Sequence, residues 1–155
     1  MADFSLGKWI SILYRYGHIY LTKELEPYNI GKGQFLFLLV LYQTDGLPQE
    51  ELAYLLNIDK GTTARAINKL EQAGYVFRKQ NEKDLRSNRI FLTEEAKNFK
   101  PQLQAILQSW TDILKEGMTE DEVEKAFNIL MKMAHNAKEH VQKDREGCIA
   151  DEATK

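Results

Sequence analysis

The amino-acid sequence predicts a mainly α-helical domain that contains one small β-hairpin, and three observations carry this prediction. The length of 155 residues is that of a single domain, and 43% of the residues are hydrophobic, which is enough to form a core. Apolar residues recur at three- and four-residue steps over most of the chain, which is the period of an amphipathic helix. Between residues 75 and 93, two short alternating runs replace this pattern and indicate strands.

The first two helices are predicted from different patterns. Over Leu6–Tyr20 the apolar residues lie on one helical stripe, and Pro27 interrupts the pattern that follows. Phe35–Leu41 is continuously apolar, with Val40 as its one β-branched residue. This composition favours a buried helix over about Gly31–Gln43 rather than a strand.

A helix-turn-helix is predicted next. Pro48 suits the start of a helix, where its missing N–H costs nothing. The apolar residues of the first short helix follow it, and they are Leu52, Ala53, Leu55 and Leu56. Asn57–Asp59 form a tight connection, and a second helix spans Lys60–Ala73 until Gly74 stops it. The second helix of such a unit can enter the major groove of DNA.

A β-hairpin and two long helices complete the chain. The strands are predicted at Tyr75–Gln80 and Arg89–Thr93, with a charged tip between them. Thr93 is suited to cap the first long helix. Thr119 and Glu122 form a capping box at the start of the second.

This order predicts a winged helix-turn-helix with long N- and C-terminal dimerisation helices. Residues 31–96 are expected to form the winged lobe, and residues 1–30 and 97–143 the helices that pair two copies of the chain. The central lobe is too small to cover the apolar faces of these helices, and exposed apolar patches of that size mark interfaces. The polar residues 144–155 are expected to be a disordered tail.

Composition argues against several other classes. The longest apolar run is far shorter than the ~20 residues of a membrane span, and no export signal opens the chain, so we expect no membrane partner. A single cysteine, Cys148, excludes a disulfide framework and fits a cytoplasmic protein, and its place in a polar tail favours an incidental role. His135 and His140 are five residues apart and do not share a helical face, so no metal site is expected. No nucleophile–base pair or phosphate loop occurs, and we expect no cofactor and no enzymatic activity.

Positive charge is concentrated in the helix-turn-helix and the hairpin. Residues 57–90 carry a net charge of +4, whereas the rest of the chain carries −6. This distribution is typical of a surface that binds a polyanion such as double-stranded DNA. An ordinary solvated charged face is the alternative, and charge alone does not decide between the two.

The exposed side of the Lys60–Ala73 helix is the predicted reading surface. The stripe expected to face the core is Ala64, Ile67 and Leu70. Arg65 is suited to contact a base, typically guanine, and Asn68 to pair with adenine. Lys60 and Lys69 are suited to contact phosphates. The full set of predicted DNA contacts is Lys60, Thr62, Thr63, Arg65, Asn68, Lys69, Lys83 and Arg86.

The tip of the hairpin extends this surface. Arg86 is placed to insert its guanidinium into the narrow, electronegative minor groove. Asp84 would repel phosphate, and it is therefore interpreted as the carboxylate that holds an arginine in an ion pair. A solubilising charged loop is the alternative, which explains the charge but not its position directly after a helix-turn-helix.

Three short segments carry a resemblance to a known family. They are Glu51-Leu52-Ala53, the stretch from Leu70 to Val76, and Asp84-Leu85-Arg86 with Arg89 and then Leu92-Thr93. At these residues the chain resembles the multiple-antibiotic-resistance regulator (MarR) family of winged helix-turn-helix transcription factors. The resemblance covers roughly residues 31–99 by motif and nearly the full length by helix order. It implies a homodimer held by the terminal helices, a wing-tip role for Arg86, and a structural ion pair of Asp84 with Arg89.

The resemblance also implies an effector, a small phenolic or anionic aromatic compound bound between the dimer helices and the DNA-binding lobe. The first helix combines aromatic side chains with polar anchors, which is what such a pocket needs. The candidate pocket residues are Trp9, Leu13, Arg15, Tyr16, His18 and Tyr20. Packing of the same side chains in a dimer core is the alternative, and the sequence leaves it open.

The predicted function is therefore that of a cytoplasmic, homodimeric transcriptional regulator. It is expected to be a ligand-responsive repressor rather than an activator, and to act on a pseudo-palindromic operator. The rival interpretation is a winged-helix module that binds protein and does not read DNA. The outward face around Arg65 and the arginine of the wing favour DNA.

Overall fold

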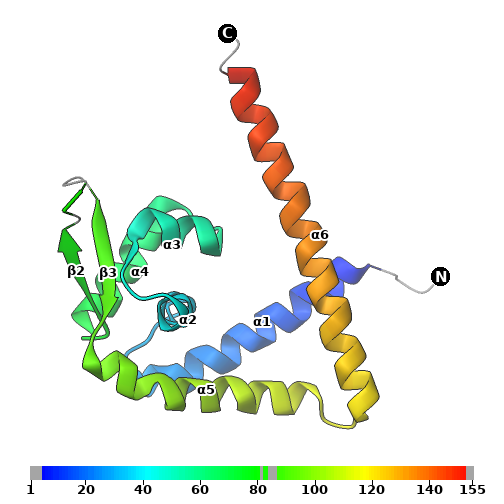
Figure 1. Ribbon diagram of the computed structural model, residues 1–155. Helices are drawn as coiled ribbons and strands as arrows, with labels where there is room; N and C mark the ends of the chain where they lie inside the picture. Colours follow the sequence, from blue (N-terminus) through cyan, green and yellow to red (C-terminus); the bar gives the residue numbers. More distant parts are fainter. Residues whose placement is uncertain (1–4, 81, 84–86, 153–155) are drawn as a thin grey trace. The chain divides into compact units, whose positions relative to one another are not determined.

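The computed structural model describes residues 5–80, 82–83 and 87–152, and Figure 1 traces the chain. Its elements are α1 (Leu6–Leu25), the short 3-10 helix η1 (Glu26–Tyr28), α2 (Phe35–Gln43), β1 (Leu47–Pro48), α3 (Gln49–Leu56), α4 (Lys60–Gln72), β2 (Val76–Gln80), β3 (Asn88–Leu92), α5 (Glu94–Leu114) and α6 (Glu120–Glu152). The chain divides into two compact units, residues 1–112 and 113–155. The predicted fold class is confirmed, and a third short strand joins the hairpin.

The core of the first unit is built around α2. Phe37, Leu38 and Leu41 are almost completely buried, as expected for a helix that is apolar on every side. The helix begins at Phe35 rather than at the predicted Gly31, because Gly33 takes a left-handed conformation with φ +75° and ends any earlier helical turn.

The sheet has three antiparallel strands in the order β1–β3–β2. β2 and β3 form the predicted hairpin, in a register that places Phe77 opposite Phe91 and Lys79 opposite Arg89. The sequence does not predict β1, because two residues are too few to show an alternating pattern. Leu47–Pro48 pair with β3, and Pro48 then stands as the N-cap of α3.

Side-chain hydrogen bonds hold β3 to the segment around β1 at the base of the wing. The Oδ1 atom of Asp45 accepts hydrogen bonds from the backbone N–H groups of Gly46, at 2.9 Å, and Leu92, at 2.8 Å. The Nε of Arg89 donates to the carbonyl of Gly46 at 2.6 Å. Gly46 has φ +72°, and a Cβ atom there would overlap the ring of Phe91, so this position requires glycine. The hairpin therefore rises from a well-anchored base.

α5 begins at the predicted cap and packs against α1. The hydroxyl of Thr93 accepts a hydrogen bond from the Ala96 N–H at 3.2 Å and donates one to the carbonyl of Gly74 at 2.7 Å. Further along the helix, the ring of Trp110 stacks on that of Tyr20, with 5.2 Å between centroids. These contacts connect the end of the wing to the N-terminal helix.

The second unit consists mainly of α6, which opens with the predicted capping box. The Thr119 N–H donates to Glu122 Oε2 at 2.8 Å, and the Glu122 N–H donates to Thr119 Oγ1 at 3.3 Å. The helix is described to Glu152, and the disorder expected for residues 144–155 stays a prediction. In the described ranges, no helix has both the length and the apolar character needed to cross a membrane.

Candidate nucleic-acid interface

The turn between α3 and α4 is stabilised on both sides. Asn57 takes the left-handed conformation, with φ +52°, and ends α3. Asp59 caps α4, because its Oδ1 accepts the Thr62 N–H at 2.8 Å. The hydrogen bonds from Thr62 hold the pKa of Asp59 below its usual value, and the guanidinium of Arg65 lowers it further. The carboxylate therefore stays charged and directed at the start of the helix.

The buried side of α4 differs from the predicted stripe by one position. Thr63, Ile67 and Leu70 are completely buried, whereas Ala64 is only partly covered. Thr63 has an exposed fraction of 0%, and its hydroxyl has no hydrogen-bond partner among the described residues. The prediction that Thr63 contacts DNA is therefore wrong. The hydroxyl suggests a surface residue, but the spacing of four and seven residues to the other two side chains places it in the core.

The opposite side of α4 is exposed. It carries four other predicted contacts of this helix, namely Thr62, Arg65, Asn68 and Lys69, and Lys60 is exposed in the first turn. The Nη2 of Arg65 donates to the Oγ1 of Thr62 at 2.8 Å, so the guanidinium lies along the first turns of the helix. The Nζ of Lys60 lies 3.1 Å from the Oε1 of Glu50, but both side chains are mostly exposed and such a pair is weak.

Sequence reasoning misses three residues of this surface. Gly61 and Gln72 are exposed on α4, and neither has the charge or the periodicity that would identify it. Arg78, on β2, is hydrogen-bonded through its guanidinium to Glu71 and to the Oδ1 of Asn68. The only signal for this link in the sequence is the opposite charge of Glu71 and Arg78 on either side of the helix–strand junction.

The outer face of the hairpin carries further positive charge. Lys79 and Arg89 lie directly opposite each other, next to the stacked rings of Phe77 and Phe91, whose centroids are 5.6 Å apart. Like charges at directly opposite positions destabilise a sheet. The two cations therefore add positive charge to this face of the hairpin. Lys83 is exposed at the end of this face.

Two predicted wing residues, Asp84 and Arg86, lie outside the described ranges. The minor-groove contact of Arg86 and the ion pair of Asp84 with Arg89 therefore remain predictions. Arg89 is placed, and its bond to the carbonyl of Gly46 joins the hairpin to β1.

Comparison with known proteins identifies the family. The sequence model of the MarR family matches residues 30–87, which run from the start of the α2 region into the wing. The HTH-type transcriptional regulator YybA of Bacillus subtilis is 30% identical over 123 residues, which are 79% of this chain and 79% of that protein. The chain belongs to the MarR family.

Solved structures of MarR proteins share the fold of this chain. A MarR transcriptional regulator from Methanosarcina mazei is 50% identical, with a TM-score of 0.84, over 86% of this chain and 96% of that one. A putative MarR family regulator from Listeria monocytogenes, crystallised with a 26mer DNA, is 29% identical, with a TM-score of 0.78, over 88% of this chain and 89% of that one. The chain is thus a DNA-binding transcriptional regulator with a winged-helix fold.

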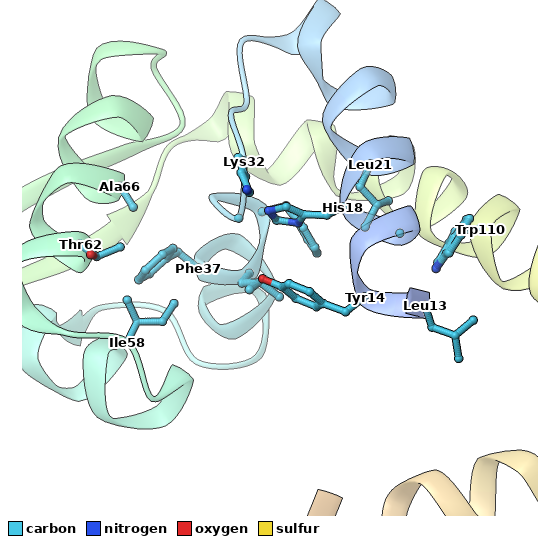
Figure 2. Close-up of a pocket in the computed structure, with 14 residues that line it drawn as sticks. Leu13, Tyr14, His18, Leu21, Lys32, Phe37, Ile58, Thr62, Ala66 and Trp110 are labelled. Carbon is cyan, nitrogen blue, oxygen red and sulfur yellow. The ribbon is translucent and has the colours of Figure 1, made fainter. Parts of the chain in front are cut away.

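A cleft of about 540 Å³ lies between α1 and the helix-turn-helix of this MarR-family chain. Figure 2 shows its lining: α1 contributes Tyr14 and His18, α4 contributes Thr62 and Ala66, and Lys32 adds an ammonium group. The rings of Tyr14 and His18 stack at 5.3 Å. Burial lowers the pKa of His18, and the charge of Lys32 lowers it further, so at neutral pH the imidazole is neutral and Lys32 supplies the positive charge.

The cleft includes only part of the predicted effector pocket. Leu13 and His18 line it, whereas the lining does not include the other four candidates, which are Trp9, Arg15, Tyr16 and Tyr20. Gly17 and Leu21 face the lobe and set the rotation of α1, so the exposed side chains of Trp9, Arg15 and Tyr16 lie elsewhere on the helix. Tyr20 stacks on Trp110 instead.

Proposed function

We propose that this MarR-family chain is a homodimeric repressor, which binds a pseudo-palindromic operator and leaves it when a small aromatic anion occupies the cleft. The observation that carries the proposal is the exposed side of α4, where Thr62 holds the guanidinium of Arg65 on the first turns of the helix. These are the turns of a recognition helix that meet base edges in the major groove. The Listeria relative crystallised with DNA supports the same use of this fold.

The side chains of α4 make two kinds of DNA contact, to bases and to phosphates. Arg65 contacts guanine through two parallel hydrogen bonds, and Thr62 orients it. Lys60 and Lys69 contact phosphates and set the register of the helix without reading sequence. Opening the exposed ion pair of Lys60 with Glu50 costs at most about 1 kcal/mol, so it does not prevent phosphate binding.

The wing adds contacts beside the helix. Lys83 and Lys79 bind the DNA backbone, and Arg86 enters the minor groove. Asp84 and Arg89 keep the hairpin in place for these contacts, Asp84 by an ion pair and Arg89 by its bond to the base of the wing.

Exposed apolar faces support pairing of two copies through residues 1–30 and 97–143. In the single chain α1 leaves large side chains exposed along one stripe, namely Leu6, Trp9, Ile10, Leu13 and Tyr16. On α6 the exposed apolar residues include Phe127, Leu130 and Val141, which share a stripe at helical spacing. A second copy that covers these faces would remove them from water. The dimer would present two recognition helices about 34 Å apart, one turn of DNA.

Selection of randomised duplexes with the purified chain tests the DNA-binding part of this proposal. We expect an inverted repeat whose half-sites lie about 10 base pairs apart, centre to centre. A reporter whose promoter overlaps the selected site should lose expression when the chain is supplied. Failure to enrich any duplex would favour the rival protein-binding module, and a rise in reporter expression would contradict the repressor.

The cleft supports the effector part of the proposal. Its walls are mainly apolar and aromatic, and Lys32 is placed to bind a carboxylate or phenolate. Thr62 lines the cleft and also holds Arg65, so an occupant that displaces Thr62 disturbs a DNA-reading side chain directly. An effector therefore weakens operator binding by moving α4.

Lys32→Met should weaken the binding of benzoate, used here as the probe, by about threefold to tenfold, because it removes the positive charge that pairs with the carboxylate. Calorimetric titration measures this change. Wild-type affinity should also rise as the pH falls through the pKa of His18, because the imidazole then becomes a second cation in the cleft.

Lys23→Met is the matched control, since Lys23 is an exposed lysine on α1 that does not line the cleft. Equal losses in the two variants would show that the effect is one of net charge. If benzoate binds but operator affinity does not fall, the cleft binds anions without regulating DNA binding.

A further inference from the structure

We propose that Arg78 makes Asn68 a hydrogen-bond donor toward DNA, so that this position of α4 selects guanine and disfavours cytosine. The inference rests on the proposed placement of α4 in the major groove. It replaces the expectation that Asn68 pairs with adenine, because that pairing needs both ends of the amide.

Glu71 anchors the arginine that acts on Asn68. Its Oε1 accepts the backbone N–H of Arg78 at 3.1 Å, and its Oε2 accepts a hydrogen bond from the Nη1 of the same residue. The side chain of Arg78 is 22% exposed and that of Glu71 is 37% exposed, so the pair is partly shielded from water. The backbone bond holds the start of β2 beside Glu71, and the charge-assisted bond from Nη1 directs the guanidinium toward α4.

The other terminal nitrogen of the guanidinium, Nη2, fixes the orientation of the Asn68 amide. The Nη2 of Arg78 donates to the Oδ1 of Asn68. A guanidinium has only donors, so the amide atom that faces it must be the oxygen, and chemistry alone settles the orientation of the amide. In the described part of the chain no acceptor is bonded to the Nδ2 of Asn68. The exposed surface of α4 therefore presents an N–H₂ group at this position.

The base edges of the major groove respond differently to such a group. Guanine offers two acceptors, adenine and thymine offer one each, and cytosine presents a donor of its own. The bidentate contact with adenine would require Asn68 to give up its bond from a charged donor, which is stronger than a neutral bond. Guanine is thus the best partner and cytosine the worst.

Asn68→Ala tests the reading role. The base preferences of the wild-type chain and the variant are compared by selection from randomised duplexes. The variant should lose the preference for guanine at one position in each half-site, by about fivefold, as expected for a lost hydrogen bond, and should keep the preferences at the other positions. Replacing that guanine by 7-deazaguanine should weaken binding of the wild type but not of the variant. Lys69→Ala, at the next residue, should leave the preference unchanged.

Arg78→Lys tests the orienting role with the positive charge retained. Lysine can still pair with Glu71 but lacks the planar fork that reaches both partners. The freed amide should then pair with adenine, and the preference at the same position should move from guanine toward adenine by about fivefold. In an Asn68→Ala background the same substitution should have no effect on that position. A purely structural role of Arg78 would change stability, read as a melting temperature, but not base identity.

Three results would overturn the inference: a wild-type preference for adenine at this position, an unchanged preference in Asn68→Ala, or an unchanged preference in Arg78→Lys. Each leaves the proposed regulator intact if the wild type still selects a specific duplex. A wild-type chain without any sequence preference would instead overturn the proposed function and this inference together.

Discussion

Leu130→Glu is expected to convert the dimer to a monomer and to weaken operator binding by more than about 100-fold. In the single chain Leu130 is 52% exposed, at the middle of the apolar stripe of α6, so the carboxylate does not disturb the isolated fold. In the proposed dimer it would be buried without a partner, at a cost of about 3–5 kcal/mol. A monomer presents one recognition helix instead of two, and the contribution of the second half-site to binding is lost.

Sedimentation velocity and titration of an operator duplex measure the two effects. Asn128→Glu is the matched control, because it introduces the same side chain on the other side of the same helix. It should leave both the dimer and operator affinity unchanged. A dimer that survives Leu130→Glu would remove α6 from the proposed interface.

Arg65→Ala is expected to cost about 1–3 kcal/mol of binding free energy on the selected operator, and to relax the base preference at one position of each half-site. The reason is the loss of a bidentate contact with a base, which no other group on that turn can replace. Thr62 remains and the helix cap at Asp59 is untouched, so the stability of the fold should not change.

Lys69→Ala separates base reading from phosphate binding. It should weaken all duplexes about equally and make the dependence of affinity on salt concentration less steep, because one phosphate contact is lost. Titrations of the operator and of an unrelated duplex at several salt concentrations provide both numbers. A uniform loss of affinity in the Arg65→Ala variant as well would show that Arg65 also contacts phosphate rather than a base.

Signals that act within a few residues are visible in the sequence and account for the parts of the fold that were predicted correctly. Thr93 caps α5 as expected, and Thr119 forms its capping box with Glu122. Gly74, with φ +84°, follows α4 where a left-handed residue was needed. Capping depends on hydrogen bonds across three residues, so neither a partner strand nor a core is required to recognise it.

The features that the sequence analysis missed or predicted incorrectly share one cause. Each depends on contacts with a part of the chain that is distant in sequence. β1 exists only because β3 offers it a partner. Thr63 is buried because of how the whole of α4 rests on the core, and its side-chain type gives the opposite indication. On α1, the side that packs on the lobe determines that Tyr14 and not Tyr16 lines the cleft.

The sequence alone determines the order of the helices, the helix-turn-helix, the wing and the concentration of positive charge around them, because periodicity, caps and net charge are properties of neighbouring residues. The resemblance to the MarR family also rests on short motifs, each formed by neighbouring residues. Only the tertiary structure decides which atom of Asn68 is free, since the bond from Arg78 joins a helix to a strand ten residues away in sequence. It also decides that Lys32 and Thr62 share one cleft. Such contacts depend on where packed elements place their side chains, and no local pattern encodes that position.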